Sequence, residues 1–210
     1  MTESRFIARS VSIIVLAIAT VLMLGSCGFT IGGPQAAICN RDSDNSAFST
    51  IDPEGAACIL TFHEARFDMS RGTIAKTALG VEADEYAPDV SSDDGLIDLE
   101  ILGPDGTLDA ATDRIRFFTT DTQPDVDRIT YFLTANSPDE LFQLVRDGSD
   151  VYGFDRTAVE DWITAASSDP HGTSDFAFDP GTALGMNVSY DLRYDENASV
   201  QVVIVDVSPL

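Results

Sequence analysis

The stretches MNVSYDLRY (residues 186–194) and VQVVIVDV (residues 200–207) decide the fold class of this chain. In the first stretch an apolar residue occupies every second position, which is the period of a half-buried strand. Its apolar positions are Met186, Val188, Tyr190, Leu192 and Tyr194. The residues 195–198 supply a turn, so the two stretches predict an antiparallel pair. The apolar run 202–205 predicts a central strand that is covered on both faces.

Further strands are predicted upstream of this pair. Residues 96–102 alternate apolar and acidic positions and are followed by a Pro-Asp-Gly turn at 104–106. Residues 114–120 and 128–134 also alternate and flank a polar loop, which predicts that they pair antiparallel. The run from Cys58 to Met69 is interpreted as one long or bulged strand, with residues 73–81 as its partner.

Two consecutive helices separate these strands from the closing pair. Ser137-Pro138-Asp139-Glu140 combines an N-cap, a first-turn proline and a capping-box glutamate, and Gly148 is expected to end this helix. Asp155 is expected to cap a second helix at about 156–167. This second helix has one apolar stripe, which must cover part of the sheet. The stripe consists of Val159, Trp162, Ile163 and Ala166.

The pattern predicts one α+β domain over residues 39–210. Its core is a mostly antiparallel sheet of about six or seven strands, with the two consecutive helices packed on one face. The strand order is not determined by the pattern. An apolar pocket near Trp162 would favour a carrier of a small molecule or a lipid.

Composition excludes some function classes. The 210 residues include 12 Lys and Arg against 35 Asp and Glu, which gives a net charge of −23. A chain this acidic is repelled by phosphate backbones, so nucleic-acid binding is not expected. Lys76 is the sole lysine, and the preference for Arg, Asp and Ala suggests a high-GC bacterium such as an actinobacterium.

The N-terminus is typical of an export signal. Arg5 and Arg9 precede an uncharged apolar run over residues 11–24. As a helix this run would span about 21 Å, which is short of the ~30 Å hydrocarbon core of a bilayer. The run ends in Leu24-Gly25-Ser26-Cys27, which resembles the lipobox of bacterial lipoproteins. An ordinary secretory signal or an uncleaved anchor is the alternative interpretation.

The resemblance implies that Cys27 carries a diacylglycerol and that residues 1–26 are removed by cleavage. Residues 27–38 would then tether the domain to the membrane, on the extracytoplasmic side. If Cys27 is lipidated, Cys39 and Cys58 remain as a pair in an oxidising compartment, and we expect a disulfide between them. Two buried free thiols are the alternative.

No catalytic motif is complete. His63 and Glu64 begin like the zinc-protease motif H-E-x-x-H, but Phe67 stands where the second histidine belongs. The acidic stretch 90–95 lacks the first and last ligands of an EF-hand loop. A second group of oxygen and nitrogen ligands lies within one loop and matches no known spacing, so both acidic stretches are interpreted as solvated. This group comprises Asp169, His171, Asp175 and Asp179.

We therefore expect a lipid-anchored cell-envelope protein with a non-catalytic binding or structural role. No cofactor and no metal site is expected, and the partners are the membrane, through Cys27, and an envelope protein or ligand that the sequence does not identify. Two alternatives stay open. One is a divalent-cation-binding module that uses the acidic loops, and the other is a cell-wall hydrolase that uses two paired carboxylates.

Overall fold

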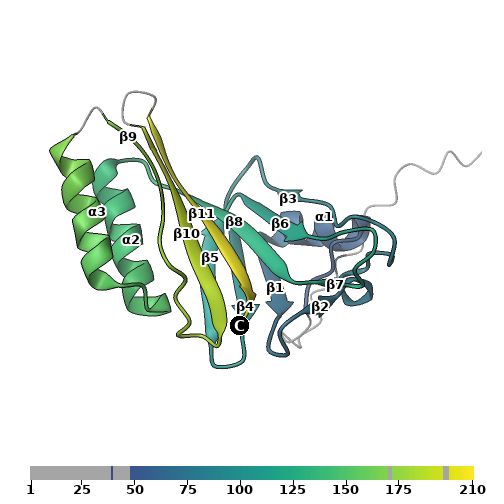
Figure 1. The fold of residues 1–210 in the computed structure, drawn as a ribbon. Coiled ribbons are helices and arrows are strands. Elements are labelled where there is room, and N and C mark those ends of the chain that lie inside the picture. The colour runs from purple at the N-terminus through teal and green to yellow at the C-terminus, as the bar shows by residue number, and fades with distance from the viewer. Residues whose placement is uncertain (1–38, 40–47, 170–171, 196–198) are drawn as a thin grey trace, which may run out of the picture. The chain divides into compact units, whose positions relative to one another are not determined.

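The computed structural model describes Cys39 and residues 48–169, 172–195 and 199–210. Its largest element is a six-stranded sheet in the order β3-β6-β8-β11-β10-β9, in which every neighbouring pair is antiparallel (Figure 1). In that order the strands are β3 (Val90–Ser91), β6 (Arg114–Phe118), β8 (Arg128–Thr134), β11 (Val200–Pro209), β10 (Met186–Asp195) and β9 (Thr173–Ala177).

Two smaller sheets complete the strands of the described residues. The three-stranded sheet has the order β1-β4-β5, with β1 (Glu64–Asp68) parallel to β4 (Ile97–Leu102). Strand β5 (Thr107–Thr112) forms a hairpin with β4 and has no partner strand on its other side. The two-stranded sheet joins β2 (Ile74–Ala75) to β7 (Asp125–Val126).

The helices begin where side chains can cap them. Helix α2 (Pro138–Tyr152) starts after Ser137, whose side chain accepts the Glu140 amide, and α3 (Arg156–Ser168) starts after Asp155, which accepts the Ala158 amide. Helix α1 (Pro53–Phe62) starts after Asp52. A short 3-10 helix covers Lys76–Leu79.

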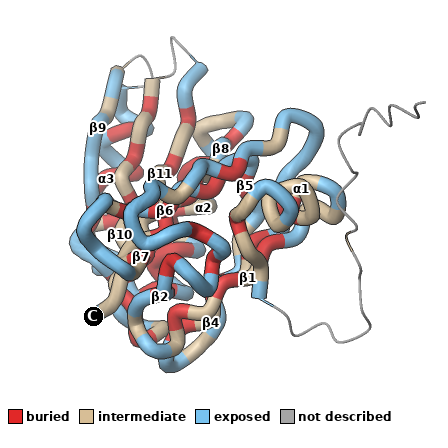
Figure 2. Tube along the Cα trace, turned by 90° about the vertical axis from the view of Figure 1, so that its right-hand side faces the viewer, coloured by how far each residue is buried: buried red, intermediate tan, exposed pale blue. Residues whose placement is uncertain are grey.

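One face of the six-stranded sheet is covered by two different layers. Buried residues on this face alternate with less buried residues along β8, β10 and β11, as the colours of the trace in Figure 2 indicate. Over β10 the cover is the helix pair, since Phe142 of α2 lies near Tyr194 and also meets Trp162 of α3. Over β6 the cover is the three-stranded sheet, whose Phe67 meets Phe117 edge-on at 5.0 Å. A seam therefore separates the free edge of β5 from α2.

Much of the predicted architecture is confirmed. The fold is α+β, the main sheet is antiparallel with six strands, and the two consecutive helices pack on one of its faces. Strand β6 pairs with β8, β10 pairs with β11, and β11 lies in the interior of the sheet. The expectation that residues 202–205 are covered on both faces is wrong, because Val202 and Ile204 are only half-buried. The turn predicted at 195–198 extends into residues outside the described part of the chain.

The strand predicted from Cys58 to Met69 is wrong for residues 58–62, which belong to α1, and confirmed for Glu64–Asp68, which form β1. The run Cys58–Phe62 is apolar and contains aromatic and β-branched residues, which favours a strand. The stronger signal lies upstream, where Asp52 accepts the Gly55 amide at 2.7 Å and Pro53 occupies the first turn. The helix ends at His63, which adopts a positive φ of 53°, and the chain then enters β1.

The strand predicted over residues 73–81 is also wrong for most of its length. Only β2 is extended, and the 3-10 helix follows at once. The cause is Lys76, whose buried ammonium group donates to the backbone carbonyls of Ala83, Glu85 and Thr120. A strand would not bring this ammonium to three carbonyls from two loops, and without them a buried lysine is costly. The predicted loop after α3 contains the edge strand β9.

Gly148 does not end α2, as the sequence predicts, but lies inside it. The helix continues to Tyr152 and ends at Gly153, which has a φ of 84°. A Cβ atom on Gly148 would lie 2.7 Å from Cε2 of Tyr190 and 2.9 Å from Cε2 of Phe154. The missing side chain therefore lets α2 pack closely against two aromatic rings.

We expect Gly148→Ala to destabilise the domain by about 1–3 kcal/mol, because overpacking against Tyr190 and Phe154 outweighs the ~1 kcal/mol that alanine gains in helix propensity. Chemical denaturation followed by circular dichroism would measure this difference. Ala165→Gly, at an exposed position of α3, serves as a control for helix propensity alone. A Gly148→Ala variant that is more stable than the wild type would contradict the close packing.

Candidate ligand pocket

A pocket of about 530 Å³ lies at the seam between the two covering layers. Helix α2 forms one wall through Leu144, Gly148 and Val151, and β5 forms the opposite wall through Thr107, Asp109 and its alanines. The large sheet supplies the floor, from β8 and β10. The pocket volume falls in the range of ordinary small-molecule sites, and its walls are largely apolar.

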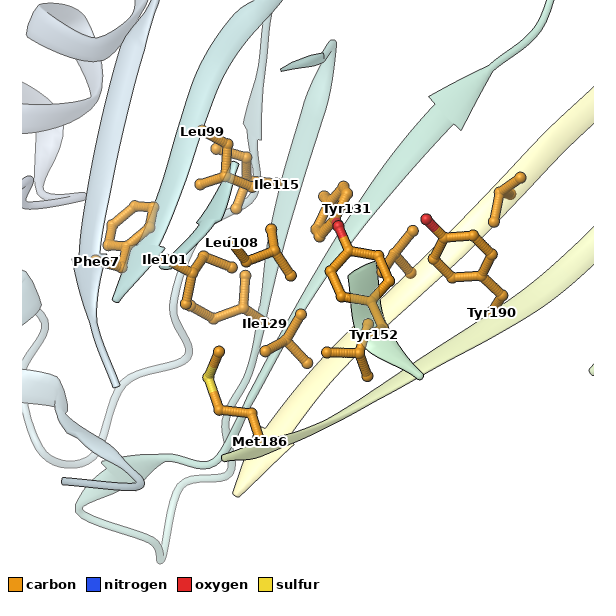
Figure 3. Packing of buried hydrophobic residues seen from close by; sticks show 14 of the residues in the cluster. Phe67, Leu99, Ile101, Leu108, Ile115, Ile129, Tyr131, Tyr152, Met186 and Tyr190 are labelled. Atoms are coloured by element: carbon orange, nitrogen blue, oxygen red, sulfur yellow. The ribbon is translucent and has the colours of Figure 1, made fainter. Parts of the chain in front are cut away.

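Three tyrosines line the inner part of this pocket, and each comes from a different element. They are Tyr131 of β8, Tyr152 of α2 and Tyr190 of β10, and Figure 3 shows their rings next to one another. The rings of Tyr152 and Tyr190 meet edge-on, 5.9 Å apart. The fold thus joins residues 131, 152 and 190, which lie far apart in the sequence, into one aromatic cluster.

The hydroxyl group of Tyr131 is buried without a hydrogen-bond partner in the described residues. The residue has an exposed fraction of 0%. The Tyr152 hydroxyl is close enough to influence it, but the two groups do not meet the geometric requirements of a hydrogen bond. An unpaired buried hydroxyl lowers the stability of a folded protein by about 1–3 kcal/mol. Tyr131, which lines the pocket, therefore keeps a hydrogen-bond donor and acceptor that a ligand could satisfy.

All three phenols resist ionisation. Burial is the largest cause that raises the pKa of Tyr131, and the neighbouring Tyr152 and Tyr190 raise this pKa further. Burial also raises the pKa of Tyr152 and the pKa of Tyr190. The carboxylates of Asp109 and Asp147 add to the increase in Tyr152 and Tyr190 respectively. The hydroxyl groups therefore remain hydrogen-bond donors at every physiological pH.

The mouth of the pocket is acidic. Asp109 and Asp113 come from β5 and the residue after it, and Glu140 and Asp147 come from α2. All four are exposed, and the lining contains no Lys, Arg or His. Two of them already bind neighbours on α2 or at its start, since Glu140 accepts from Asn136 and Asp147 accepts from Gln143. Negative charge at the mouth favours a ligand that carries positive charge.

Trp162 does not line this pocket. Its indole Nε1 donates to Ser174 Oγ at 3.0 Å, and its ring packs edge-on against Phe142 and Phe178. Trp162 therefore joins α3 to β9 and the sheet, which agrees with its predicted role in covering one sheet face.

The other residues considered from the sequence do not converge on a site. Asp175 pairs with Arg193, Asp169 and Asp179 are exposed, and His171 lies outside the described residues. In the stretch 90–95, Ser92 donates to Asp94, whose carboxylate is also 3.8 Å from Nε2 of His63. Within the described residues, no three His, Cys, Asp or Glu side chains are grouped so that they could hold a metal ion.

The sulfur atoms of Cys39 and Cys58 lie at disulfide distance, with 2.10 Å between them. The bond ties the start of the described chain to the middle of α1. Cys27, the segment 1–26 that is predicted to be cleaved and the predicted tether 27–38 lie outside the described residues. In the part of the chain that the structure describes, no helix has the length and apolarity needed to span a membrane.

Sequence reasoning does not identify this pocket. A pocket requires the spatial arrangement of β5, β8, β10 and α2, and the sequence does not reveal that β5 is a strand or that it lies opposite α2. The available signals are the tyrosines at 152 and 190 and the glycine at 148, which stands inside a strongly patterned helix. Comparison with known proteins gives no further guide, because the chain matches no protein-family model, no curated protein and no solved structure.

We expect the stability of the domain to fall as the pH rises above about 10, the ordinary pKa of tyrosine. Above this pH the unfolded chain releases phenolic protons that the folded chain retains, because the folded pKa values of Tyr131, Tyr152 and Tyr190 are raised. Denaturation curves at a series of alkaline pH values would measure this loss, and phenolate absorbance would follow ionisation. Ionisation of all five tyrosines near pH 10 in the folded protein would contradict it.

Proposed function

We propose that this chain is a lipid-anchored binding protein of the bacterial cell envelope, and that the pocket between α2 and β5 holds its ligand. The ligand has an apolar or aromatic body and a cationic group. The observation that carries this proposal is the buried hydroxyl of Tyr131, which has no hydrogen-bond partner in the described residues, on a residue that lines an apolar pocket whose mouth bears four carboxylates.

The pocket supports each part of this ligand chemistry. Its apolar walls and tyrosine rings favour an aromatic or aliphatic body. The Tyr131 hydroxyl makes no hydrogen bond with the described residues, so a ligand that pairs with it relieves the free-energy cost of an unpaired buried hydroxyl. The carboxylates at the mouth attract a cation, and Asp109 and Asp147 are close enough to influence the phenols.

The proposal of a binding role at the membrane surface rests on the sequence. The lipobox-like residues 24–27 would place the lipid on Cys27, and the Cys39–Cys58 disulfide supports an oxidising compartment. Neither alternative function gains a specific observation. A divalent-cation module has no ligand cluster in the described residues, and no pair of buried carboxylates lines the pocket.

We expect naphthylmethylamine to raise the melting temperature of the full chain, and naphthoate, its anionic counterpart, to have no comparable effect. Binding to the native state adds stability of RT ln(1 + [L]/Kd), so the shift reports affinity. Tyr131→Phe should abolish most of the amine-induced shift while leaving the stability without ligand equal or higher, because the lost hydroxyl is unpaired.

Tyr86→Phe is the matched control, because it removes the same atom from a tyrosine that is 65% exposed. Asp147→Asn should weaken amine binding by roughly 1 kcal/mol through the loss of one exposed charge at the mouth. Equal shifts with the amine and the carboxylate, in both wild type and Tyr131→Phe, would refute the assigned pocket chemistry.

We expect Cys27→Ser to release the protein from the membrane. Two or more acyl chains hold a protein firmly on a bilayer, and serine cannot form the thioether that would carry them. Fractionation of bacterial cells and mass spectrometry of the N-terminal peptide would show the change. Cys39→Ser provides the control, since it removes the Cys39–Cys58 disulfide without affecting the lipidation residue. Wild-type chain with unmodified Cys27 would contradict the anchor.

A further inference from the structure

The second face of the six-stranded sheet is the one that neither the helix pair nor the three-stranded sheet covers. Those layers pack on the face of Phe117, Tyr190 and Tyr194, and the opposite side chains are half-buried or exposed. On the open face, Phe118 of β6 is 46% exposed, and Phe132, Val202 and Ile204 are half-buried. Half of the apolar run 202–205 thus stays partly exposed within a single copy.

The open face also carries arginines for which the described residues provide no acidic partner. Arg114 and Arg128 form no ion pair within the described residues, although the chain has 35 acidic residues. Each is instead placed near an aromatic ring, with Arg114 5.7 Å from the Phe132 centroid and Arg128 4.3 Å from the Phe118 centroid. Arg116, on the same face, is paired with Asp89. The β6–β8 half of this face is therefore positively charged.

The β10 half of the same face has the opposite charge. Asp191 of β10 and Asp206 of β11 lie there. Arg193 pairs with Asp191 and with Asp175, while Asp206 accepts a hydrogen bond from Thr130. Burial and the like charge of the neighbouring Asp206 raise the pKa of Asp191. The face thus has a basic half and an acidic half, with apolar residues between them.

The strand register places these features in a single row across the sheet. Phe132 of β8 is opposite Ile204 of β11, and Ile204 is opposite Asp191 of β10. The pair Ile115–Tyr131 fixes the register between β6 and β8, which puts Arg114 beside Phe132. The row therefore reads Arg114, Phe132, Ile204, Asp191, from basic through apolar to acidic.

We propose that this open face binds the same face of a second copy of the chain. The two copies are then related by a two-fold axis that lies between the two sheets, parallel to the strands and level with the line between β8 and β11. Rotation about this axis reverses the order of the row in the second copy. Arg114 then faces Asp191 of the second copy, and Phe132 faces Ile204. Such an isologous contact is self-complementary, buries the apolar centre and supplies the carboxylates that Arg114 lacks in one copy. Two sheets packed face to face form a sandwich with about 10 Å between them.

The test is the oligomeric state of the full chain, measured by sedimentation equilibrium in a density-matched detergent. The wild type should be a dimer. Arg114→Asp and Asp191→Arg should each weaken dimerisation at least about tenfold, because each places like charges opposite one another at both symmetry-related contacts. An equimolar mixture of the two variants should recover dimers, since each mixed pair restores both opposite-charge contacts. The double variant should also dimerise.

Arg156→Asp is the matched control, because it makes the same charge change on α3, on the covered side of the sheet. It should leave the dimer unchanged. A wild type that stays monomeric at the highest attainable concentration overturns the proposal, as does a dimer that Arg114→Asp and Asp191→Arg both leave intact. A monomeric wild type whose Arg114→Asp variant loses binding to phosphatidylglycerol vesicles would assign the face to the membrane instead, and overturns it too.

Discussion

The packing of two unlike layers on one face of a single antiparallel sheet is the constraint on which the rest of this structure depends. Helices α2 and α3 cover one part of the face, and the three-stranded sheet covers the other. A helix and a sheet edge have different outlines, so they do not close completely against each other. The space that remains between α2 and β5 is the pocket, and its floor is the sheet itself.

Close packing on the helix side fixes the depth of that space. Gly148 brings α2 against Tyr190 and Phe154, and the aromatic contacts extend through Phe178 to Trp162 on α3. These contacts hold Tyr152 beside Tyr190, where burial keeps both phenols protonated. The chemistry of the pocket is thus a consequence of one glycine and the rings around it.

Acidic and basic side chains gather on different parts of the surface. The mouth of the pocket carries four carboxylates. On the basic half of the open sheet face, Arg114 and Arg128 contact phenylalanines and form no ion pair within the described residues. In a chain with a net charge of −23, such a basic region stands out from the remaining surface. The proposed cationic ligand depends on the carboxylates at the mouth of the pocket. The proposed second copy depends on the arginines of the open face.

Local sequence by itself determined the strands with strict alternation and the helices with complete caps. Apolar and polar residues alternate over 97–102, 128–134 and 186–194 because one side of each strand is buried. Helices α2 and α3 are predictable because Ser137 and Asp155 cap them through hydrogen bonds to amides within four residues. The sequence also suggested the Cys39–Cys58 pair by parity. These signals act over short distances or by counting, so no fold is needed to find them.

Tertiary structure alone decided the outcome where local preferences competed or where distant segments meet. Residues 58–62 favour a strand by composition but continue a helix begun at Asp52, and Lys76 bends its segment to reach carbonyls that come from elsewhere in the chain. The pocket joins residues 109, 131, 148 and 190, and the charged row joins 114 to 191, because antiparallel pairing brings distant residues into register. The periodicity of the sequence does not predict these contacts, because they depend on strand order and on which layer covers each part of the sheet.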